Sequence, residues 1–322
     1  MLDLHRLRLL RELKHRGTLA AVAEALAYSP STISQQLAVL EREAGVPLLE
    51  PVGRRVRLTP QAEILVAHTE AVLERLERAE ADLAASLEGL TGTLRVAAFQ
   101  TAALALVPDA LSRLGAAHPR LRVEVTQCEP ESALPALLAR DFDVAVTEEY
   151  PDEPMPRPDG IEYAELGRDE MRLALPTGSA SGSPTGSASG EAALAAAADL
   201  PWVMEPAGTA SRRWATRLCR DAGFEPDVRY ESTDLLLHLR LVERGHAAAL
   251  LPDLVWTGAA PAVPVARLPR GRHVRRLYAA TRRGSGAHPA VRAWCEALAR
   301  PLRERPPREH PQETLKGFAD GG

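Results

Sequence analysis

Several residue types are scarce in this chain, and each scarcity limits its interpretation. Among 39 basic residues only Lys14 and Lys316 are lysines, which we attribute to codon bias in a GC-rich genome rather than to function. The three cysteines, Cys128, Cys219 and Cys295, lie far apart and form no CxxC pair. We interpret them as reduced thiols of a cytoplasmic protein, with a redox-sensing pair as the alternative.

Long apolar runs and catalytic motifs are also missing. No stretch approaches the roughly 18 apolar residues of a membrane helix, and no signal peptide precedes the first periodic segment. The nine histidines lack metal-ligand spacing, and no GxSxG, Walker, GxGxxG or HExxH motif occurs. The sequence therefore predicts a cytoplasmic protein without membrane contact, cofactor, metal site or catalytic residues.

Length and charge distribution indicate several units. The 322 residues are enough for two or three compact units, and 45% apolar with 25% charged content is typical of globular proteins. Residues 1–60 carry nine basic and six acidic side chains, about +3, whereas residues 61–90 carry two arginines and seven acids, about −5. A basic segment next to an acidic connector predicts separate tasks for the two.

The first 45 residues have helical periodicity in three segments. Leucines repeat at mostly helical spacing over 2–13, and Gly17 is expected to end that helix. Thr18 is the expected N-cap of a short Ala-rich helix, and Ser29 with Pro30 is expected to begin the next one, which ends at Gly45. Two helices joined by a three- or four-residue turn form a helix-turn-helix pattern.

The beginning of the second helix of this pair is rich in hydroxyl and amide side chains. A helix-turn-helix places such turns in the major groove of DNA, where glutamine pairs with adenine and hydroxyls are adaptable. A merely solvated face is the alternative. The segment "PLLEPVGRRVRLTP" predicts a hairpin with a positive tip for phosphates or a minor groove. The predicted DNA-contacting residues are Thr18, Ser29, Pro30, Ser31, Thr32, Ser34, Gln35, Gln36, Arg54, Arg55 and Arg57.

A long helix is expected to follow Pro60, over about 61–87. Its apolar positions with heptad-like spacing are Leu65, Val72, Leu76, Leu83 and Leu87. A helix with one such stripe needs a partner. The simplest partner is the same helix of a second copy of the chain, and the alternative is that the stripe packs against other parts of its own chain.

From residue 92 onward, segments typical of strands alternate with segments typical of helices. This alternation predicts parallel sheets with right-handed crossovers in two blocks, the second starting near Glu165. The heptapeptide "PTGSASG" occurs at 176–182 and again at 184–190, and we expect a flexible surface loop there. The Pro-rich, charged tail is expected to be disordered.

These motifs resemble those of the LysR-type transcriptional regulators over about residues 2–300. The residues in step with the family pattern are Ser29, Ser34, Gln36, Leu37, Leu40, Glu41, Gly45, Val46, Leu48, Arg54, Arg55, Leu58, Thr59 and Pro60. Gln35 and Pro51 stand where family members commonly carry arginine, so we expect altered base preference or weaker phosphate contact. "ERGHAAALLPD" is similar to the family's Gly-x-Gly-apolar-apolar-Leu-Pro stretch, with His246 and Ala247 in place of smaller residues.

The resemblance implies an α/β protein with an N-terminal, all-α winged helix-turn-helix, a long linker helix for dimerisation and a periplasmic-binding-protein-like effector domain with two lobes joined by two crossing strands. The expected division is a DNA-binding domain at 1–60, a linker helix at 61–88 and a disordered tail at 303–322. The first effector lobe is expected at 89–165 and 269–302. The second is expected at 166–268, with the flexible insertion at 176–190.

In such folds a ligand lies between the lobes, where strands end and helices begin. The residues expected at those positions are Gln100, Thr101, Thr147, Glu148, Glu205, Thr209 and Ser232. A capping or surface role is the alternative for each of them. His246 of the family-like stretch is a further candidate for ligand contact, with an ordinary loop residue as the alternative. Helix N-termini at the strand-end positions offer free N–H donors that suit an anion, whereas Glu148, Glu149 and Glu205 add negative charge that favours a cationic or polyhydroxyl ligand.

The sequence thus predicts a regulator of transcription that binds a partly palindromic promoter site in double-stranded DNA as a homodimer or homotetramer. A small-molecule effector between the lobes would modulate this binding, and RNA polymerase is a further candidate partner. Two alternatives remain: an architectural DNA-binding dimer without an effector, and a small-molecule-binding enzyme with an incidental helix-turn-helix.

Overall fold

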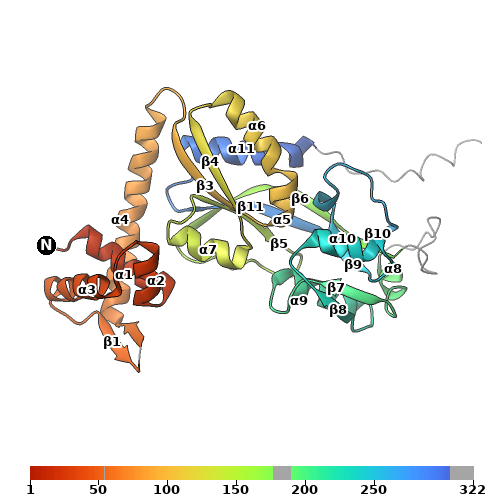
Figure 1. Ribbon diagram of the computed structural model, residues 1–322, viewed down its shortest axis with the longest axis horizontal. Coiled ribbons are helices and arrows are strands. Elements are labelled where there is room, and N and C mark those ends of the chain that lie inside the picture. Colours follow the sequence, from red (N-terminus) through yellow and green to blue (C-terminus); the bar gives the residue numbers. More distant parts are fainter. Residues whose placement is uncertain (54, 177–189, 305–322) are drawn as a thin grey trace, which may run out of the picture.

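A small head and a two-lobed body are connected by one long helix (Figure 1). The computed structural model describes residues 1–53, 55–176 and 190–304. The elements of the head are α1 (Leu4–Arg16), α2 (Leu19–Ala25), α3 (Pro30–Ala44), β1 (Leu49–Val52) and β2 (Arg55–Leu58). Four residues separate α2 from α3, and β1 pairs with β2 in an antiparallel hairpin. The predicted helix-turn-helix and hairpin are both confirmed.

Local capping sets the helix boundaries of the head. The Thr18 side chain accepts a hydrogen bond from Ala21 N at 3.1 Å, which caps α2. Gly17 and Gly45 end α1 and α3 in the left-handed region, at φ 77° and 71°. Glycine adopts this conformation without steric cost. The three helices pack around one small core whose fully buried leucines and isoleucine include Leu9, Leu10, Leu13, Ile33, Leu37 and Leu40.

The connecting helix α4 (Pro60–Ala85) has two different apolar faces. One face is buried against the same chain and consists of Ala62, Val66, Thr69, Leu73, Glu77 and Ala81. The other face is exposed and carries Ile64, Val72, Leu76 and Leu83. The stripe predicted from the sequence is mostly this exposed face. Leu65, however, packs against the core of the head, and Leu87 lies beyond the end of the helix.

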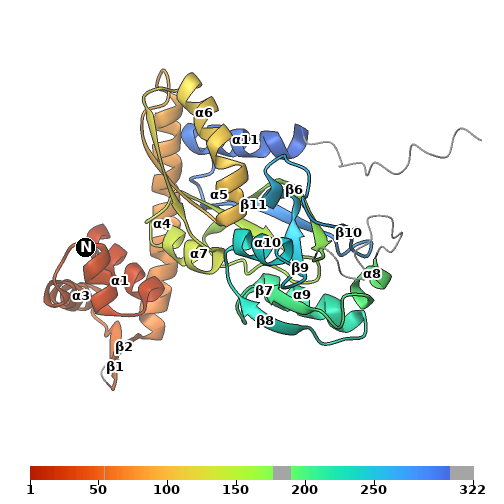
Figure 2. The ribbon, with the colours of Figure 1, turned by 45° about the vertical axis from the view of Figure 1, so that its right-hand side comes forward.

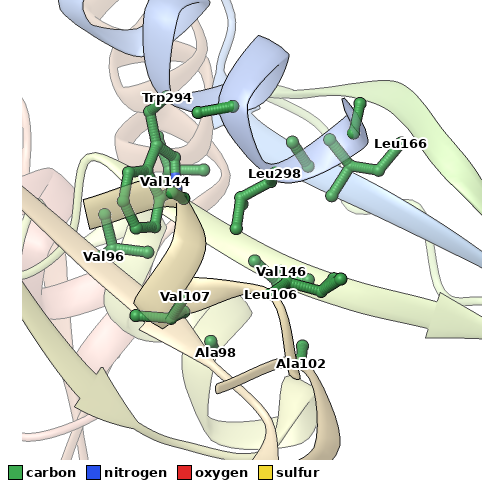
Figure 3. Packing of buried hydrophobic residues seen from close by; sticks show 14 of the residues in the cluster. Val96, Ala98, Ala102, Leu106, Val107, Val144, Val146, Leu166, Trp294 and Leu298 are labelled. Carbon is green, nitrogen blue, oxygen red and sulfur yellow. The ribbon is translucent and has the colours of Figure 1, made fainter. Parts of the chain in front are cut away.

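The first lobe is a sheet covered by helices on both faces. Its parallel strands are β3 (Gly92–Ala98), β4 (Leu121–Gln127) and β5 (Val144–Glu149). The helices are α5 (Gln100–Ala105), α6 (Val107–Ala117), α7 (Pro130–Leu138) and α11 (Pro289–Glu304). Trp294 and Leu298 of α11 pack with Val96, Val144 and Val146 of the sheet (Figure 3). The last helix thus returns to the first lobe, as predicted.

Two long strands run through both lobes. They are β6 (Ile161–Ala174) and β11 (Val274–Arg282), which pair antiparallel in a sheet of order β10-β6-β11-β5-β3-β4, with β9 also pairing β6. They are the two crossing strands that the family resemblance implies. The parallel pairing expected from strand–helix alternation holds for β3 with β4 and β5 and for β7 with β8 of the second lobe, but not for β6, which pairs antiparallel with β9, β10 and β11. β11 lies between β5 and β6 and runs antiparallel to both, so β5 and β6 run in the same direction without pairing with each other. Residue 165, where a change of lobe was expected, lies within β6.

The second lobe is built on the far ends of these strands (Figure 2). Its strands are β7 (Pro201–Met204), β8 (Asp227–Glu231), β9 (Ala249–Pro252) and β10 (Val265–Arg267). Its helices are α8 (Glu191–Ala195), α9 (Ala210–Asp221), α10 (Leu235–Glu243) and the 3-10 helix η1 (Asp253–Trp256). Trp202, Trp214 and Leu218 are buried at its centre.

Some sequence predictions fall outside the described residues. They concern Arg54, almost all of the repeated heptapeptide and the tail from residue 305. No helix in the described ranges is long and apolar enough to cross a membrane. Over the same ranges, no group of three or more potential metal-ligating side chains comes together.

Candidate DNA interface and interlobe site

The N-terminus of α3 is ordered by its own hydroxyl groups. Ser29 Oγ accepts from Thr32 N at 3.1 Å and lies 2.7 Å from Ser31 Oγ and 2.8 Å from Thr32 Oγ1. Pro30 occupies the first helical position, where no backbone N–H is needed. The predicted cap is confirmed, and the small side chains leave the first turn of α3 accessible.

The two faces of α3 are sharply divided. Ile33, Leu37 and Leu40 are buried in the head, whereas Ser31, Ser34 and Gln35 are exposed. The exposed side chains follow one another on one side of the first two turns, which suits contact with base edges.

Two of the predicted contact residues also have structural partners. Gln36 is half-buried, and its Oε1 accepts from Arg6 Nη1 at 3.5 Å. Thr18 is half-buried and caps α2. These contacts give both residues a role in the folded head itself.

Two arginines of the described hairpin, Arg55 and Arg57, lie on β2, and Arg57 is already paired. Arg57 is exposed and its Nε donates to Glu50 Oε1 at 2.7 Å, across the β1–β2 register. Arg55 lies opposite Val52 near the tip of the hairpin. Glu41 Oε1 accepts from Leu48 N at 2.8 Å and so ties α3 to the start of the hairpin.

A fully buried arginine lies between the lobes at the start of β11. Arg275 Nη2 donates to Asp169 Oδ2 at 2.7 Å and to Thr101 Oγ1 at 2.8 Å, and its Nη1 donates to Glu148 Oε2 at 2.5 Å. Its guanidinium carbon lies 5.3 Å from the centre of the Phe99 ring. Side chains from β5, from α5 and from the middle of β6 thus meet at one cation of β11.

Acidic side chains around this arginine outnumber it. Burial, followed by the negative charge of Glu148, raises the pKa of Glu129 to about 7 and that of Glu205 to about 8. Burial also raises the pKa of Glu148 itself, although Arg275 opposes the shift. Glu129 begins α7 in the first lobe and Glu205 follows β7 in the second, so the carboxyl groups of both lobes influence one another.

A direct contact between the lobes lies beside this cluster. Gln100 Oε1 accepts from Leu235 N at 2.7 Å, and Gln100 Nε2 donates to Asp234 Oδ1. Ser232 Oγ accepts from Asp234 N at 3.0 Å. The beginning of α5 in the first lobe therefore meets the beginning of α10 in the second.

The remaining predicted ligand residues are Thr209, Thr147 and His246, and only the first two lie near the interlobe cluster or are buried. Thr209 caps α9, accepting from Arg212 N at 3.1 Å close to Glu205. Thr147 is buried, and its Oγ1 has no hydrogen-bond partner among the described residues. His246 is exposed after the C-terminus of α10. That helix is about 14 Å long, so His246 lies far from the α10 start that Gln100 contacts.

Sequence reasoning missed the central residues of the interlobe site. Arg275 is one of several arginines in "VRRLYAATRR", and nothing in the pattern distinguishes it from its neighbours. Asp169 lies within β6, and Glu129 precedes a helix like many acidic residues. Only the pairing of β5, β6 and β11 brings these groups together.

Family models match nearly the whole chain. Residues 4–63 match a model described as bacterial regulatory helix-turn-helix protein, lysR family, and residues 87–303 match the LysR substrate binding domain. A probable hydrogen peroxide-inducible genes activator of Mycobacterium avium is 29% identical over 73% of this chain and 72% of its own. The transcriptional dual regulator GltC of Bacillus subtilis is 25% identical over 81% of this chain and 84% of its own.

Solved structures share the architecture. A full-length OxyR variant from Pseudomonas aeruginosa superposes with a TM-score of 0.66 at 21% identity, covering 95% of this chain and 99% of that chain. Full-length CbnR in complex with its target DNA gives a TM-score of 0.52 at 24% identity, covering 93% and 99%. At these identities the comparison establishes the fold.

Proposed function

The chain belongs to the LysR family of bacterial DNA-binding transcriptional regulators, and we propose that it reads a promoter site with α3 and responds to a small molecule held between its lobes. The proposal that α3 reads a promoter site rests on the difference between its buried and its exposed side. Its apolar side holds the head together while Ser31, Ser34 and Gln35 are left exposed behind a Ser29 cap. Free N–H groups of this cap also suit a phosphate.

Replacing Ser34 and Gln35 by alanine tests this assignment. Each lost base-edge contact costs about 1–3 kcal/mol of discrimination, so affinity for the target site should fall roughly tenfold or more while affinity for random duplex stays within about twofold. Fluorescence anisotropy with full-length protein and footprint-derived DNA measures both. Equal losses on both duplexes would contradict base reading, and Glu24→Ala on exposed α2 serves as a matched control.

We propose that two chains pair through the exposed face of α4. Val72, Leu76 and Leu83 are 47%, 41% and 68% exposed, and their spacing of four and seven residues is typical of helix pairing. Two heads on one dimer would suit a partly palindromic site, and two dimers would form the tetramer expected from the sequence. The CbnR structure cited above contains its target DNA, which supports DNA as the partner.

For the effector, the cluster around Arg275 supports a cationic or polyhydroxyl molecule. Arg275 is already matched by Asp169 and Glu148, so Glu129 and Glu205 contribute uncompensated negative charge when ionised. A thermal-shift screen of small amines, sugars and carboxylates distinguishes a sensor from an architectural dimer, because a specific ligand stabilises the folded state by mass action. Stabilisation by carboxylates alone would contradict the proposed ligand class.

Peroxide is a different stimulus, suggested by the names of some relatives. The thiols here do not support it, because burial raises the pKa of Cys219 to about 12 and that of Cys295 to about 11, and also raises that of Cys128. A reactive cysteine needs a depressed pKa and access to solvent. We therefore propose a non-covalent effector for this chain.

A further inference from the structure

The head contacts the body through the C-terminus of α7 (Figure 2). Arg11 Nη2 of α1 donates to Leu138 O at 2.5 Å, and Arg16 Nη2 donates to Ala139 O at 3.2 Å and to Asp141 Oδ1 at 2.8 Å. The last carbonyls of a helix lack intrahelical partners and carry partial negative charge. Two arginines of the head therefore cap a helix of the effector domain.

Glu12 holds these two arginines in position. Its Oε1 lies 3.1 Å from Arg11 Nη1 and its Oε2 lies 2.9 Å from Arg16 Nε. Glu12 and Arg11 are almost completely buried, at 4% and 5% exposure. The guanidinium groups are thus oriented within α1, so little side-chain entropy remains to be lost when they contact α7.

The junction is charged and incompletely packed. A cavity of about 250 Å³ lies between α1, α4 and the first lobe, and its walls include Arg11, Glu70, Glu77, Arg140 and Arg282. Contacts of this kind resemble interfaces between domains that move rather than a continuous hydrophobic core. The two surfaces are therefore suited to separate and to meet again.

The two ends of α4 are fixed to different parts of the molecule. Near its start, Ala62 and Val66 are buried in the core of the head. Further along, Glu77 Oε1 accepts from Arg282 Nε of β11 at 2.7 Å. A Cβ atom at Gly284 would lie 2.7 Å from the carbonyl oxygen of Glu74, so the loop after β11 also presses directly on α4.

The segment of α4 between these two attachments contains a feature that bends helices. Thr69 is buried, and its Oγ1 donates to Leu65 O at 2.7 Å. A hydroxyl that bonds back to the carbonyl four residues earlier competes with the backbone ladder and often bends the helix. The head's contacts with α4 continue to Glu70, whose Oε1 lies 3.1 Å from His15 Nε2 of α1. The turn from Thr69 to Leu73, where these contacts end, is therefore the place where the head can change its angle to the body.

We propose that Arg11 and Arg16, docked on the C-terminus of α7, form a latch that fixes the angle between head and effector domain, and that α4 bends near Thr69 when the latch opens. Because α3 and the hairpin move with α1 as one core, the latch sets the separation and tilt of the two reading helices in a dimer. Its effect on site choice rests on the proposed function, whereas the latch itself rests only on the contacts described.

The first test measures the distance between head and first lobe, which changes when the angle between them changes. Spin labels on Glu24→Cys of α2 and Asp109→Cys of α6, both exposed, report the distance between head and first lobe in a full-length background of Cys128→Ser, Cys219→Ala and Cys295→Ala. Labelled chains are diluted so that each oligomer carries one. Wild type should give one narrow distance distribution, and Arg11→Gln/Arg16→Gln should broaden it at least twofold.

A matched control removes the same charge from the same helix. Arg8→Gln/Lys14→Gln changes two exposed basic residues of α1, of which Lys14 pairs with Glu63 of α4 rather than with the body. This control should keep the narrow distribution. Identical distributions for wild type and the Arg11/Arg16 variant, or equal broadening in the control, would overturn the latch. Adding Thr69→Ala should narrow the broadened distribution, and no narrowing would overturn the bend at Thr69.

The second test measures site choice. On duplexes whose half-site spacing changes one base pair at a time, wild type and control should prefer one spacing by about tenfold, and the latch variant should bind all spacings within about threefold. An unchanged preference would overturn the role of the latch in site selection. Failure of every chain to bind any duplex would instead refute the proposed function, and the spin-label distances would still decide whether the latch exists.

Discussion

The two regions of this protein that we propose as binding sites are built in opposite ways. The reading face of α3 is exposed, uncharged and organised by contacts within a few residues of the chain, such as the cap from Ser29 to Thr32. The interlobe site is buried and charged, and its centre depends on Arg275 and Asp169, which are 106 residues apart. The head therefore presents uncharged hydrogen-bonding groups on its surface, whereas the body encloses its charged groups.

The largest effect that would sharpen this comparison is expected at Arg275. Arg275→Gln leaves Asp169 and Glu148 buried without their cation, and breaking a buried pair in this way costs about 3–5 kcal/mol of unfolding free energy. Arg276→Gln, which removes the neighbouring exposed partner of Glu149, should cost less than about 1 kcal/mol. Urea denaturation measures both. A loss below about 1 kcal/mol for Arg275→Gln would show that this cation is not structural.

A smaller effect is expected from pH. Burial raises the pKa of folded Glu205 to about 8 from its ordinary 4.5, so the folded state binds more protons than the unfolded state between these values. Its contribution to stability is complete below pH 4.5 and is lost as pH rises through 8. The melting temperature should fall by a few degrees from pH 5 to pH 9, and Glu205→Gln should reduce this decline.

The control for this pH effect is Glu191→Gln, an exposed carboxylate of the same lobe, which should leave the decline unchanged. A cationic effector should also stabilise the protein more at pH 9 than at pH 5, because more of the cluster is then ionised. If Glu205→Gln and wild type have the same pH profile, Glu205 is not the source of this pH dependence.

The smallest effect is expected at the hairpin. Arg57 must give up part of its contact with Glu50 before it reaches a phosphate, so Arg57→Gln should weaken binding to all duplexes only a few-fold and reduce the salt slope by about 1. Glu50→Gln should have the opposite effect on affinity. Binding titrations at several salt concentrations measure both, and an unchanged slope for Arg57→Gln would remove it from the phosphate contacts.

The same comparison explains what the sequence could predict. Caps, glycine stops and the polar start of α3 depend on neighbours in the chain, so Ser29, Gly45 and the helix-turn-helix were predicted correctly. The exposed face of α4 was also anticipated, except at Leu65, because a stripe shows periodicity but not which partner covers it. Its second, buried face contains Thr69 and Glu77, which no apolar pattern indicates.

The interlobe site was predicted only in outline. Strand ends indicated Gln100, Thr101 and Glu148, and the structure places them beside Arg275 or across from α10. Arg275 itself was missed because its role depends on the register between β5 and β11, which brings it next to Glu148. His246 was grouped with these residues because it belongs to a familiar sequence stretch, yet the length of α10 separates it from them.

The two faces of α4 also restrict how related chains can differ in length. Each residue advances an α-helix by about 100°, so a single insertion between Thr69 and Leu76 would rotate the head by this angle relative to the body, which Arg282 fixes to α4 at Glu77. It would also divide the exposed apolar face into two offset parts. Only additions close to whole numbers of turns, about 7 or 11 residues, keep both faces in register. Gaps in alignments of this helix should therefore be absent or of those sizes, while the loops of the second lobe vary freely.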